Sequence, residues 1–387
     1  MAATIGLAGS CYSDPANFAR ERAAALLPSW QWACHVSDLP TSGTAVRVDF
    51  AGRSAFVLRG RDNTLRAFSN VCRHRGSRLL DGDLRTGLAF CVDAKVRCPY
   101  HGWVYDEQGT LIQESGEALA AAQPERRALP LQSLPVESWR GWVFVAFEAP
   151  SRPFASLVAP VEQELQYYPF EAVRRAAEPQ LHSLRADWKA VGEHLLDIAH
   201  LERSRPGPKA RIGRGHCVER RGDQVVAMTA KIASGANGSW SERAYARWLP
   251  RMEQFPEERR ALWCRYYLWP NLALEITPDQ VAVVRVLPDA AGESRLRTVT
   301  YAIPDGSREM HLARYLNARV RRRATMQDLR LLERRQAGLA VGDHAGGPLG
   351  DDEAGVQWFT GRLTDLLAQT APRPVLTRRG PRPREAT

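Results

Sequence analysis

The 387-residue chain lacks any uninterrupted apolar run long enough to form a transmembrane helix. Its N-terminus also lacks the basic-then-apolar layout of a signal peptide, so we expect a cytoplasmic protein with no membrane association. No G-x-G-x-x-G fingerprint and no flavin motif occurs, so the chain carries no recognisable nucleotide-binding segment. No internal repeat is visible either.

Cysteine is scarce, and its number and spacing argue against a disulfide framework. The chain has seven cysteines, which is an odd number. Five of them are scattered singly along the sequence: Cys11, Cys34, Cys91, Cys217 and Cys264. Such scatter fits reduced thiols. The other two, Cys72 and Cys98, each have a histidine close by.

The chain does have the composition of a soluble globular protein with more than one domain. It is 44% apolar and 25% charged, with eleven tryptophans, and its length suggests two domains. Short β-prone runs broken by Gly, Asp and Asn occupy residues 31–150, after an amphipathic helical segment within residues 1–30. The Pro-rich stretch Ala149–Pro153 marks a boundary.

Residues 151–370 mix β-runs with helical patterns, and the longest helices are expected at about Glu309–Leu339 and Glu353–Leu367. Residues 371–387 form a Pro- and Arg-rich tail that we expect to be disordered. These patterns predict an α+β protein, in which an all-β domain precedes an α+β domain with an antiparallel sheet and C-terminal helices.

Two short pairs of metal-binding residue types lie in the β-rich half. Cys72 and His74 form a C-x-H pair, and Cys98 and His101 form a C-x₂-H pair. Structural zinc is one interpretation of two thiolates and two imidazoles. Zinc fingers, however, group like ligands together, whereas each pair here is mixed. Mixed pairs are typical of a Rieske [2Fe–2S] centre, in which two histidines replace two cysteines on one iron.

A Rieske cluster transfers single electrons, so a second catalytic group is expected. If Asp187–His200 is one continuous helix, Glu193, Asp197 and His200 fall on one face at i, i+4 and i+7. Two carboxylates and an imidazole on one face suit a non-haem iron(II) site. Taken alone, the same spacing fits polar positions on a helix surface better.

Both regions resemble the Rieske-type ring-hydroxylating oxygenases. Asn70–Gly76 and Cys98–Trp103 match the two cluster-binding loops of that family almost residue for residue. The frame W-K-x₃-E-N-x₂-D-x₂-H-x₄-H of the family fits Trp188–His200, and its C-terminal pattern E-D-x₄-E-x₂-Q-x-G-L is similar to Thr325–Leu339. The resemblance spans nearly the whole chain, and the second half looks closer to the choline- and betaine-type monooxygenases than to naphthalene-type enzymes.

The resemblance implies a role for each matching residue. The four cluster ligands would be Cys72, His74, Cys98 and His101. His200 and Asp328 would be ligands of a mononuclear iron. Asp197 would be the carboxylate that links the two metals across neighbouring subunits, and together with Glu193 it is a candidate catalytic residue.

Two departures from the family pattern affect the mononuclear site. Arg205 stands where the family has its second histidine ligand, and a protonated guanidinium cannot ligate iron. His194 replaces the family asparagine and is six residues from His200, so its use as a ligand would need a distorted helix. His216 is another alternative for the third ligand. Loss of the mononuclear site also remains open.

The resemblance implies the oxygenase component of a Rieske non-haem iron system, acting as a monooxygenase or dioxygenase. Electrons from NAD(P)H would arrive through a separate reductase or ferredoxin. O₂ would then be used to hydroxylate or oxidatively demethylate a small organic substrate, in a homotrimer. The alternative is an electron-transfer or structural subunit with a degenerate mononuclear iron site.

The net charge of +10 raises the separate hypothesis of nucleic-acid binding. Arginines cluster in Arg314–Arg323 and in the tail, but no nucleic-acid fold motif accompanies them. A basic surface that attracts an acidic electron-transfer partner is the better explanation. Five aromatic residues could line a substrate pocket or pack in the core: Trp240, Trp248, Trp263, Tyr266 and Tyr267.

Overall fold

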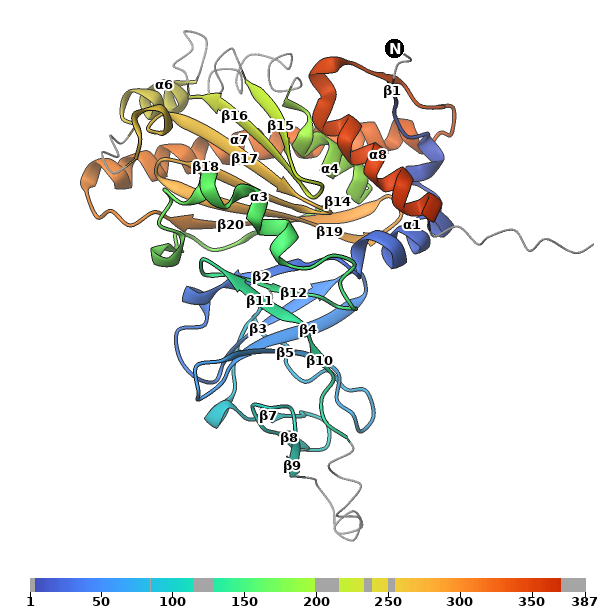
Figure 1. The fold of residues 1–387 in the computed structure, drawn as a ribbon, viewed down its shortest axis with the longest axis vertical. Helices are drawn as coiled ribbons and strands as arrows, with labels where there is room; N and C mark the ends of the chain where they lie inside the picture. Colours follow the sequence, from blue (N-terminus) through green and yellow to red (C-terminus); the bar gives the residue numbers. More distant parts are fainter. Residues whose placement is uncertain are drawn as a thin grey trace, which may run out of the picture.

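The computed structural model describes residues 4–83, 85–113, 129–198, 216–232, 239–249 and 255–369. Two β-rich bodies follow one another along the long axis of the molecule (Figure 1). The lower body in this view holds the β-strands between residues 31 and 145, and the upper body holds a long antiparallel sheet with helices. The predicted tail at residues 371–387 lies outside the described residues.

The chain begins with an edge strand and a short helix that pack on the upper body. β1 (Thr4–Ile5) pairs with β21 (Pro348–Leu349), and α1 (Pro15–Glu21) continues into a π-helical turn at Arg22–Leu26. Asp14 caps α1 by accepting a hydrogen bond from the Ala16 amide at 2.8 Å. The helix expected within residues 1–30 is therefore confirmed.

The lower body consists of three antiparallel sheets. The five-stranded sheet has the order β10 (Ser133–Leu134), β5 (Leu65–Ser69), β4 (Arg53–Arg59), β3 (Thr44–Phe50) and β6 (Leu88–Phe90). A second sheet consists of β11 (Val136–Trp139), β12 (Trp142–Val145) and β2 (Gln31–His35). The third consists of β7 (Val96–Arg97), β8 (Val104–Tyr105) and β9 (Leu111–Gln113). Figure 1 shows this third sheet at the end of the molecule farthest from the upper body.

The upper body is built on one antiparallel sheet. Its strand order is β13 (Arg174–Arg175), β20 (Glu293–Ala302), β19 (Gln280–Ala290), β18 (Leu272–Thr277), β17 (Leu262–Leu268), β16 (Val225–Lys231) and β15 (Cys217–Arg221), and β14 (Gln180–Leu184) also pairs with β20. This arrangement confirms the predicted antiparallel sheet and the predicted fold class.

The two faces of this sheet have different coverings, because side chains alternate along each strand. One face packs against α3 (Ala155–Leu165) and the β2–β11–β12 sheet of the lower body, and buries Tyr266 and Leu274. The opposite face packs against α4 (Trp188–Leu196), α7 (Arg308–Leu339) and α8 (Ala354–Gln369). The short helix α6 (Trp240–Arg247) packs on α7.

The long helix α7 was predicted closely from the sequence. Ser307 caps it by accepting a hydrogen bond from the Met310 amide at 3.2 Å, and the helix ends at Leu339. No helix in the described ranges is long and apolar enough to span a membrane.

The condition that Asp187–His200 is one continuous helix is not met. Helix α4 ends at Leu196, and Asp197 follows with φ −85° and ψ 86°. The carbonyl oxygen of Leu195, near this helix end, accepts a hydrogen bond from the Arg265 guanidinium at 2.9 Å. The sequence spacing could not indicate this contact, because Arg265 comes from β17 of the sheet.

Candidate metal centres and substrate pocket

The two predicted cluster-binding loops share one backbone arrangement. Each cysteine amide donates to a carbonyl five residues later, and each cysteine carbonyl accepts from a glycine amide four residues later. The four hydrogen bonds are Cys72 to Ser77 (2.8 Å), Gly76 to Cys72 (3.0 Å), Cys98 to Trp103 (2.7 Å) and Gly102 to Cys98 (3.1 Å). Both glycines have positive φ, 74° and 71°, a conformation that glycine adopts without strain. Each loop therefore holds its cysteine and its histidine on one tight turn.

The structure brings the two loops together with the cysteines inside and the histidines outside. Cys72 and Cys98 are each 2% exposed, whereas His74 and His101 are half-buried. The two imidazole rings lie 4.8 Å apart between centroids, and the His74 ring stacks on Trp103 at 4.6 Å. This arrangement fits a cluster with one iron on two buried thiolates and the other on two imidazoles near the surface.

The surroundings of the two thiols differ. Burial raises the pKa of the Cys72 thiol, although its sulfur lies 3.4 Å from the Tyr105 hydroxyl, which partly offsets the effect. Burial would also raise the pKa of Cys98, but the backbone amides of His101 and Tyr100 outweigh it and lower that pKa. Amide donors that favour a thiolate are the expected environment of an iron–sulfur ligand.

Cys91 lies in the segment between the two loops and is buried beside β6, where burial raises the pKa of its thiol to about 11. It takes part in no disulfide, and neither do the other six cysteines. Burial alone does not separate Cys91 from the candidate ligands, since Cys72 and Cys98 are buried to the same degree.

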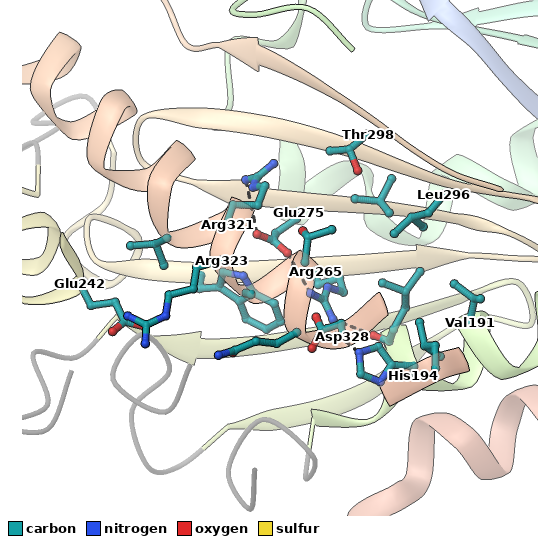
Figure 2. A pocket seen from close by; sticks show the side chains of 18 residues that line it. Val191, His194, Glu242, Arg265, Glu275, Leu296, Thr298, Arg321, Arg323 and Asp328 are labelled. Carbon is teal, nitrogen blue, oxygen red and sulfur yellow. Dashed lines mark hydrogen bonds and ion pairs between the residues drawn. The ribbon is translucent and has the colours of Figure 1, made fainter. Parts of the chain in front are cut away.

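The candidate mononuclear site joins two helices. Asp328 on α7 lies with its Oδ2 atom 3.5 Å from Nε2 of His194 on α4 (Figure 2). Two ligands that bind one metal ion at about 2.1 Å are themselves about 3 to 3.5 Å apart, so this pair fits a shared metal ion. His200 and Arg205 lie outside the described residues, and His216 does not line the pocket that contains Asp328.

Within the ranges that the structure describes, no three His, Cys, Asp or Glu side chains converge on one metal position. A Rieske cluster requires two pairs of ligands rather than a group of three. At the mononuclear site, the described part of the chain contributes the pair His194 and Asp328.

Gln336 holds α7 in register with α4. Its side-chain oxygen accepts from the Asp187 amide at 3.0 Å, and its amide group donates to the Tyr12 carbonyl at 3.0 Å. Asp187 in turn caps α4 by accepting from the Lys189 amide. Gln336 is eight residues after Asp328 on the same helix, so these contacts help to place Asp328 beside His194.

Glu193 and Asp197 do not line the pocket that contains Asp328. Glu193 is buried, accepts a hydrogen bond from the Tyr12 hydroxyl at 2.7 Å and forms an ion pair with Arg335. Asp197 is half-buried and lines a separate cavity with Glu193 and Arg335. The carboxylate of Glu193 thus contacts the N-terminal segment, and His194 turns toward Asp328.

A pocket of about 100 Å³ opens beside Asp328 between α7 and the sheet (Figure 2). Much of its wall is apolar: Val191, Leu195, Trp263, Val284, Leu296, Val320 and Leu332. The wall also contains Arg265, Glu275 and Arg321, which sequence inspection did not select. The available sequence signal was an arginine and a glutamate in β-prone segments. The strand register that pairs them could not be read from the sequence.

The aromatic residues suggested for the pocket mostly lie elsewhere. Trp263 lines the pocket, whereas Trp240 and Trp248 are 65% and 49% exposed. Tyr266 is buried on the other face of the sheet, and the buried Tyr267 donates its hydroxyl to the Pro270 carbonyl at 2.6 Å. Core packing is therefore the role of both tyrosines.

Two family models match this chain. The model of the ring-hydroxylating α-subunit catalytic domain matches residues 170–369, which is more than half of the chain. The chain belongs to the ring-hydroxylating α-subunit family. The Rieske [2Fe–2S] domain model matches residues 29–124 of this α subunit, a range that contains both cluster-binding loops.

Curated relatives of this α subunit include monooxygenase oxygenase subunits. The carnitine monooxygenase oxygenase subunit of Escherichia coli (strain K12) is 28% identical over 280 residues, which cover 69% of this chain and 66% of that protein. The glycine betaine monooxygenase oxygenase subunit of Chromohalobacter salexigens is 30% identical over 198 residues, which cover 50% of this chain and 42% of that protein. The matches thus span less than two thirds of each relative.

Solved structures show the same fold for this α subunit. A quaternary ammonium Rieske monooxygenase in complex with an inhibitor has a TM-score of 0.78 at 19% identity, covering 94% of this chain and 96% of that chain. Naphthalene 1,2-dioxygenase has a TM-score of 0.74 at 16% identity, covering 95% and 94%. The resemblance predicted from the sequence is confirmed.

Proposed function

We propose that this α subunit is the oxygenase component of a Rieske non-haem iron system. It would use O₂ and electrons supplied by a separate reductase or ferredoxin to hydroxylate or oxidatively demethylate a small organic substrate. The observation that carries the proposal is the pair His194 and Asp328, which lies beside a partly open, largely apolar pocket in a chain that also has two matching candidate cluster-binding loops.

The two metal groups would be held by different parts of the chain. The cluster ligands are Cys72, His74, Cys98 and His101, and the mononuclear iron ligands are His194, His200 and Asp328. When bound, the cluster supplies single electrons and the iron supplies the centre at which O₂ is activated.

We assign His194 as the third iron ligand, because Arg205 cannot ligate iron. The end of α4 at Leu196 supports this choice, since His194 and His200 then need not share the face of one regular helix. The contact of His194 with Asp328 supports it independently. Two imidazoles and one carboxylate make up the ligand set typical of non-haem iron(II) oxygenases.

The pocket residues would bind the substrate and keep water away from the reacting atoms. Val191, Leu195 and Val284 form an apolar wall beside His194 and Asp328. Such a wall suits an apolar substrate and strengthens electrostatic interactions inside the pocket.

The cluster loops of one chain would serve the pocket of its neighbour in a homotrimer. Figure 1 supports this arrangement, because β7 and β8, which flank the Cys98 loop, lie at the opposite end of the long axis from the catalytic sheet. Large apolar side chains are exposed near this end: Val71 (43%), Phe90 (65%), Val92 (71%), Tyr100 (62%) and Ile112 (49%). Exposed apolar groups of this kind favour docking on another protein surface. Asp197 would then connect a cluster histidine of the neighbouring chain with the iron site.

The proposal is tested by oxygen incorporation. The purified protein is combined with NADH, a Rieske-system reductase and ¹⁸O₂, and supplied with a panel of small organic acids and quaternary ammonium compounds. Substrate-dependent ¹⁸O in a hydroxylated product, or formaldehyde from a demethylated one, is expected, and Asp328→Asn should abolish it. O₂ uptake that yields only peroxide with every compound would contradict the proposal.

The second candidate, an electron-transfer subunit with a degenerate iron site, is favoured by Arg205 alone. It predicts that the reductase reduces the cluster but that no compound raises O₂ consumption. Arg205→His would separate the two candidates. If the natural site is degenerate, this variant gains iron and activity, and if His194 already serves, it gains neither.

A further inference from the structure

The pocket beside Asp328 contains a buried charge arrangement that iron binding does not require. Glu275 accepts a hydrogen bond from Arg265 at 2.9 Å and forms an ion pair with Arg321 at 3.4 Å. The three side chains are only 9%, 13% and 12% exposed, respectively. In the Arg265–Glu275–Arg321 triad, two guanidinium groups thus contact one carboxylate.

The fold directs all three members of the triad into the pocket. Arg265 on β17 and Glu275 on β18 are direct cross-strand partners, on the same sheet face as Trp263. Arg321 comes from α7, seven residues before Asp328, so two helical turns place both side chains on one face of the helix. Figure 2 shows Arg265 between Glu275 and Asp328.

A buried triad of charged groups contributes little to the stability of a fold. Burying three charged groups costs desolvation energy, and apolar residues of similar size usually stabilise a protein as well or better. The Nε atom of Arg265 is also buried without a hydrogen-bond partner among the described residues. Buried polar atoms in native structures normally have a partner, which suggests that a ligand completes this one.

The same pocket is poorly suited to a quaternary ammonium group. Trp263 is the only tryptophan, tyrosine or phenylalanine in the described part of the wall. The Arg265 guanidinium lies 4.9 Å above the Trp263 ring and already occupies that face. Quaternary ammonium groups are typically bound on open aromatic faces, and a cation already on such a face repels them.

We propose that the substrate is a small organic acid, with a carboxylate that lies against the Arg265–Glu275–Arg321 triad and an apolar body that faces the aliphatic wall. This inference rests on the proposed function, because the body would then lie toward Asp328. A carboxylate matches the fork geometry of a guanidinium and can accept a hydrogen bond from the buried Nε atom of Arg265. The proposed substrate shares a carboxylate with carnitine and glycine betaine, after which two of the similar proteins are named, but it lacks their quaternary ammonium group.

Three probes with the same aromatic body test the charge preference: benzoate, benzamide and phenyltrimethylammonium. Their affinities for the iron-loaded full chain are measured by titration calorimetry, without turnover. Benzoate should bind at least about tenfold more tightly than benzamide, as expected for a charge-assisted hydrogen bond, and the ammonium probe should bind more weakly than both. Equal affinities, preference for the ammonium probe, or no binding of any probe would overturn the inference.

Two variants with opposite expected effects separate substrate binding from a structural role. Arg321→Gln should weaken benzoate binding about tenfold, whereas Glu275→Gln should leave it unchanged or strengthen it, because the pocket gains positive charge. A purely structural triad would make both variants weaken binding alike, which would overturn the inference. Arg322→Gln, an exposed neighbour on α7, is the matched control. If Arg321→Gln does not fold, the change in benzoate affinity caused by Glu275→Gln decides between substrate binding and a structural role.

Iron content and reductase-driven O₂ consumption of the same preparations distinguish the two proposals. If both variants change benzoate affinity as expected but the protein holds no mononuclear iron, the proposed function is overturned and the charge preference is not. Turnover of a quaternary ammonium compound by a chain that ignores benzoate would overturn only the charge preference.

Discussion

At the scale of single residues, the candidate cluster ligands could be picked out from the sequence, and the candidate iron ligands only in part. The C-x-H and C-x₂-H pairs are local, so short spacing carries the whole signal, and both loops have closely similar turns. His194 was discounted because its position was judged on a continuous helix. The distance between His194 and Asp328 depends on how α4 packs on α7, which no local pattern encodes.

His35 gives a prediction about stability and pH. It is buried, with Nε2 2.9 Å from the Phe170 carbonyl and Nδ1 2.8 Å from the Ser37 hydroxyl. Burial lowers its pKa from 6.5 to about 4, so between these values the unfolded chain binds more protons than the folded protein. The resulting stability is present above pH 6.5 and is lost as the pH falls toward 4.

The expected loss is about 2 kcal/mol in the free energy of unfolding between pH 7 and pH 5. It is measured by urea unfolding of the wild type and of His35→Gln at both pH values. The variant should be less stable at pH 7 but should lose less stability on acidification. Parallel losses in the two proteins would show that His35 does not titrate in this way.

At the scale of secondary-structure elements, helices and strands were predictable where the local pattern agreed with the tertiary contacts. Helix α7 has an N-cap serine and a long uninterrupted helical stretch, and its predicted range matches closely. Helix α4 ends at Leu196, whereas the spacing argument from the sequence assumed a helix that runs to His200. The pairing of Arg265 with Glu275 in the pocket likewise depends on the register of β17 against β18, so the two residues could not be grouped from the sequence.

A buried ion cluster joins α1 to the start of α4. The Lys189 amine lies 2.8 Å from Glu21 and 2.6 Å from Asp187, and all three side chains are at most 1% exposed. Lys189→Met would leave two buried carboxylates without their cation, so we expect it to lower the free energy of unfolding by about 3–5 kcal/mol. Lys95→Met, at an exposed position, is the control and should change stability by less than about 0.5 kcal/mol. Similar stabilities of the two variants would contradict this role.

At the scale of the whole molecule, the separation between the cluster end and the catalytic sheet is the reason that the proposed function has electrons cross between chains. Figure 1 places β7 and β8 at one end of the long axis and the sheet of the upper body at the other. A single chain therefore cannot be the functional unit under the proposed function. The sequence implied this only through its family resemblance, because no residue pattern reports a distance between domains.

Asp197 carries the prediction at this scale. Asp197→Asn should keep about three irons per chain and a reducible cluster, yet slow reoxidation of the cluster by O₂ and substrate at least about tenfold, because the proposed link between subunits is broken. Stopped-flow absorbance of the reduced cluster measures this rate. Glu353→Gln, which changes another acid lining the same cavity, is the matched control. Unchanged reoxidation in Asp197→Asn would remove Asp197 from the electron path.

The central claim is that this chain holds a mononuclear iron in addition to its cluster, despite Arg205. The most direct measurement is the iron content per chain of anaerobically purified, reconstituted protein, compared with His194→Ala. The account predicts about three irons in the wild type and about two in the variant, with the visible spectrum of the cluster retained in both. A value of two in the wild type would contradict it.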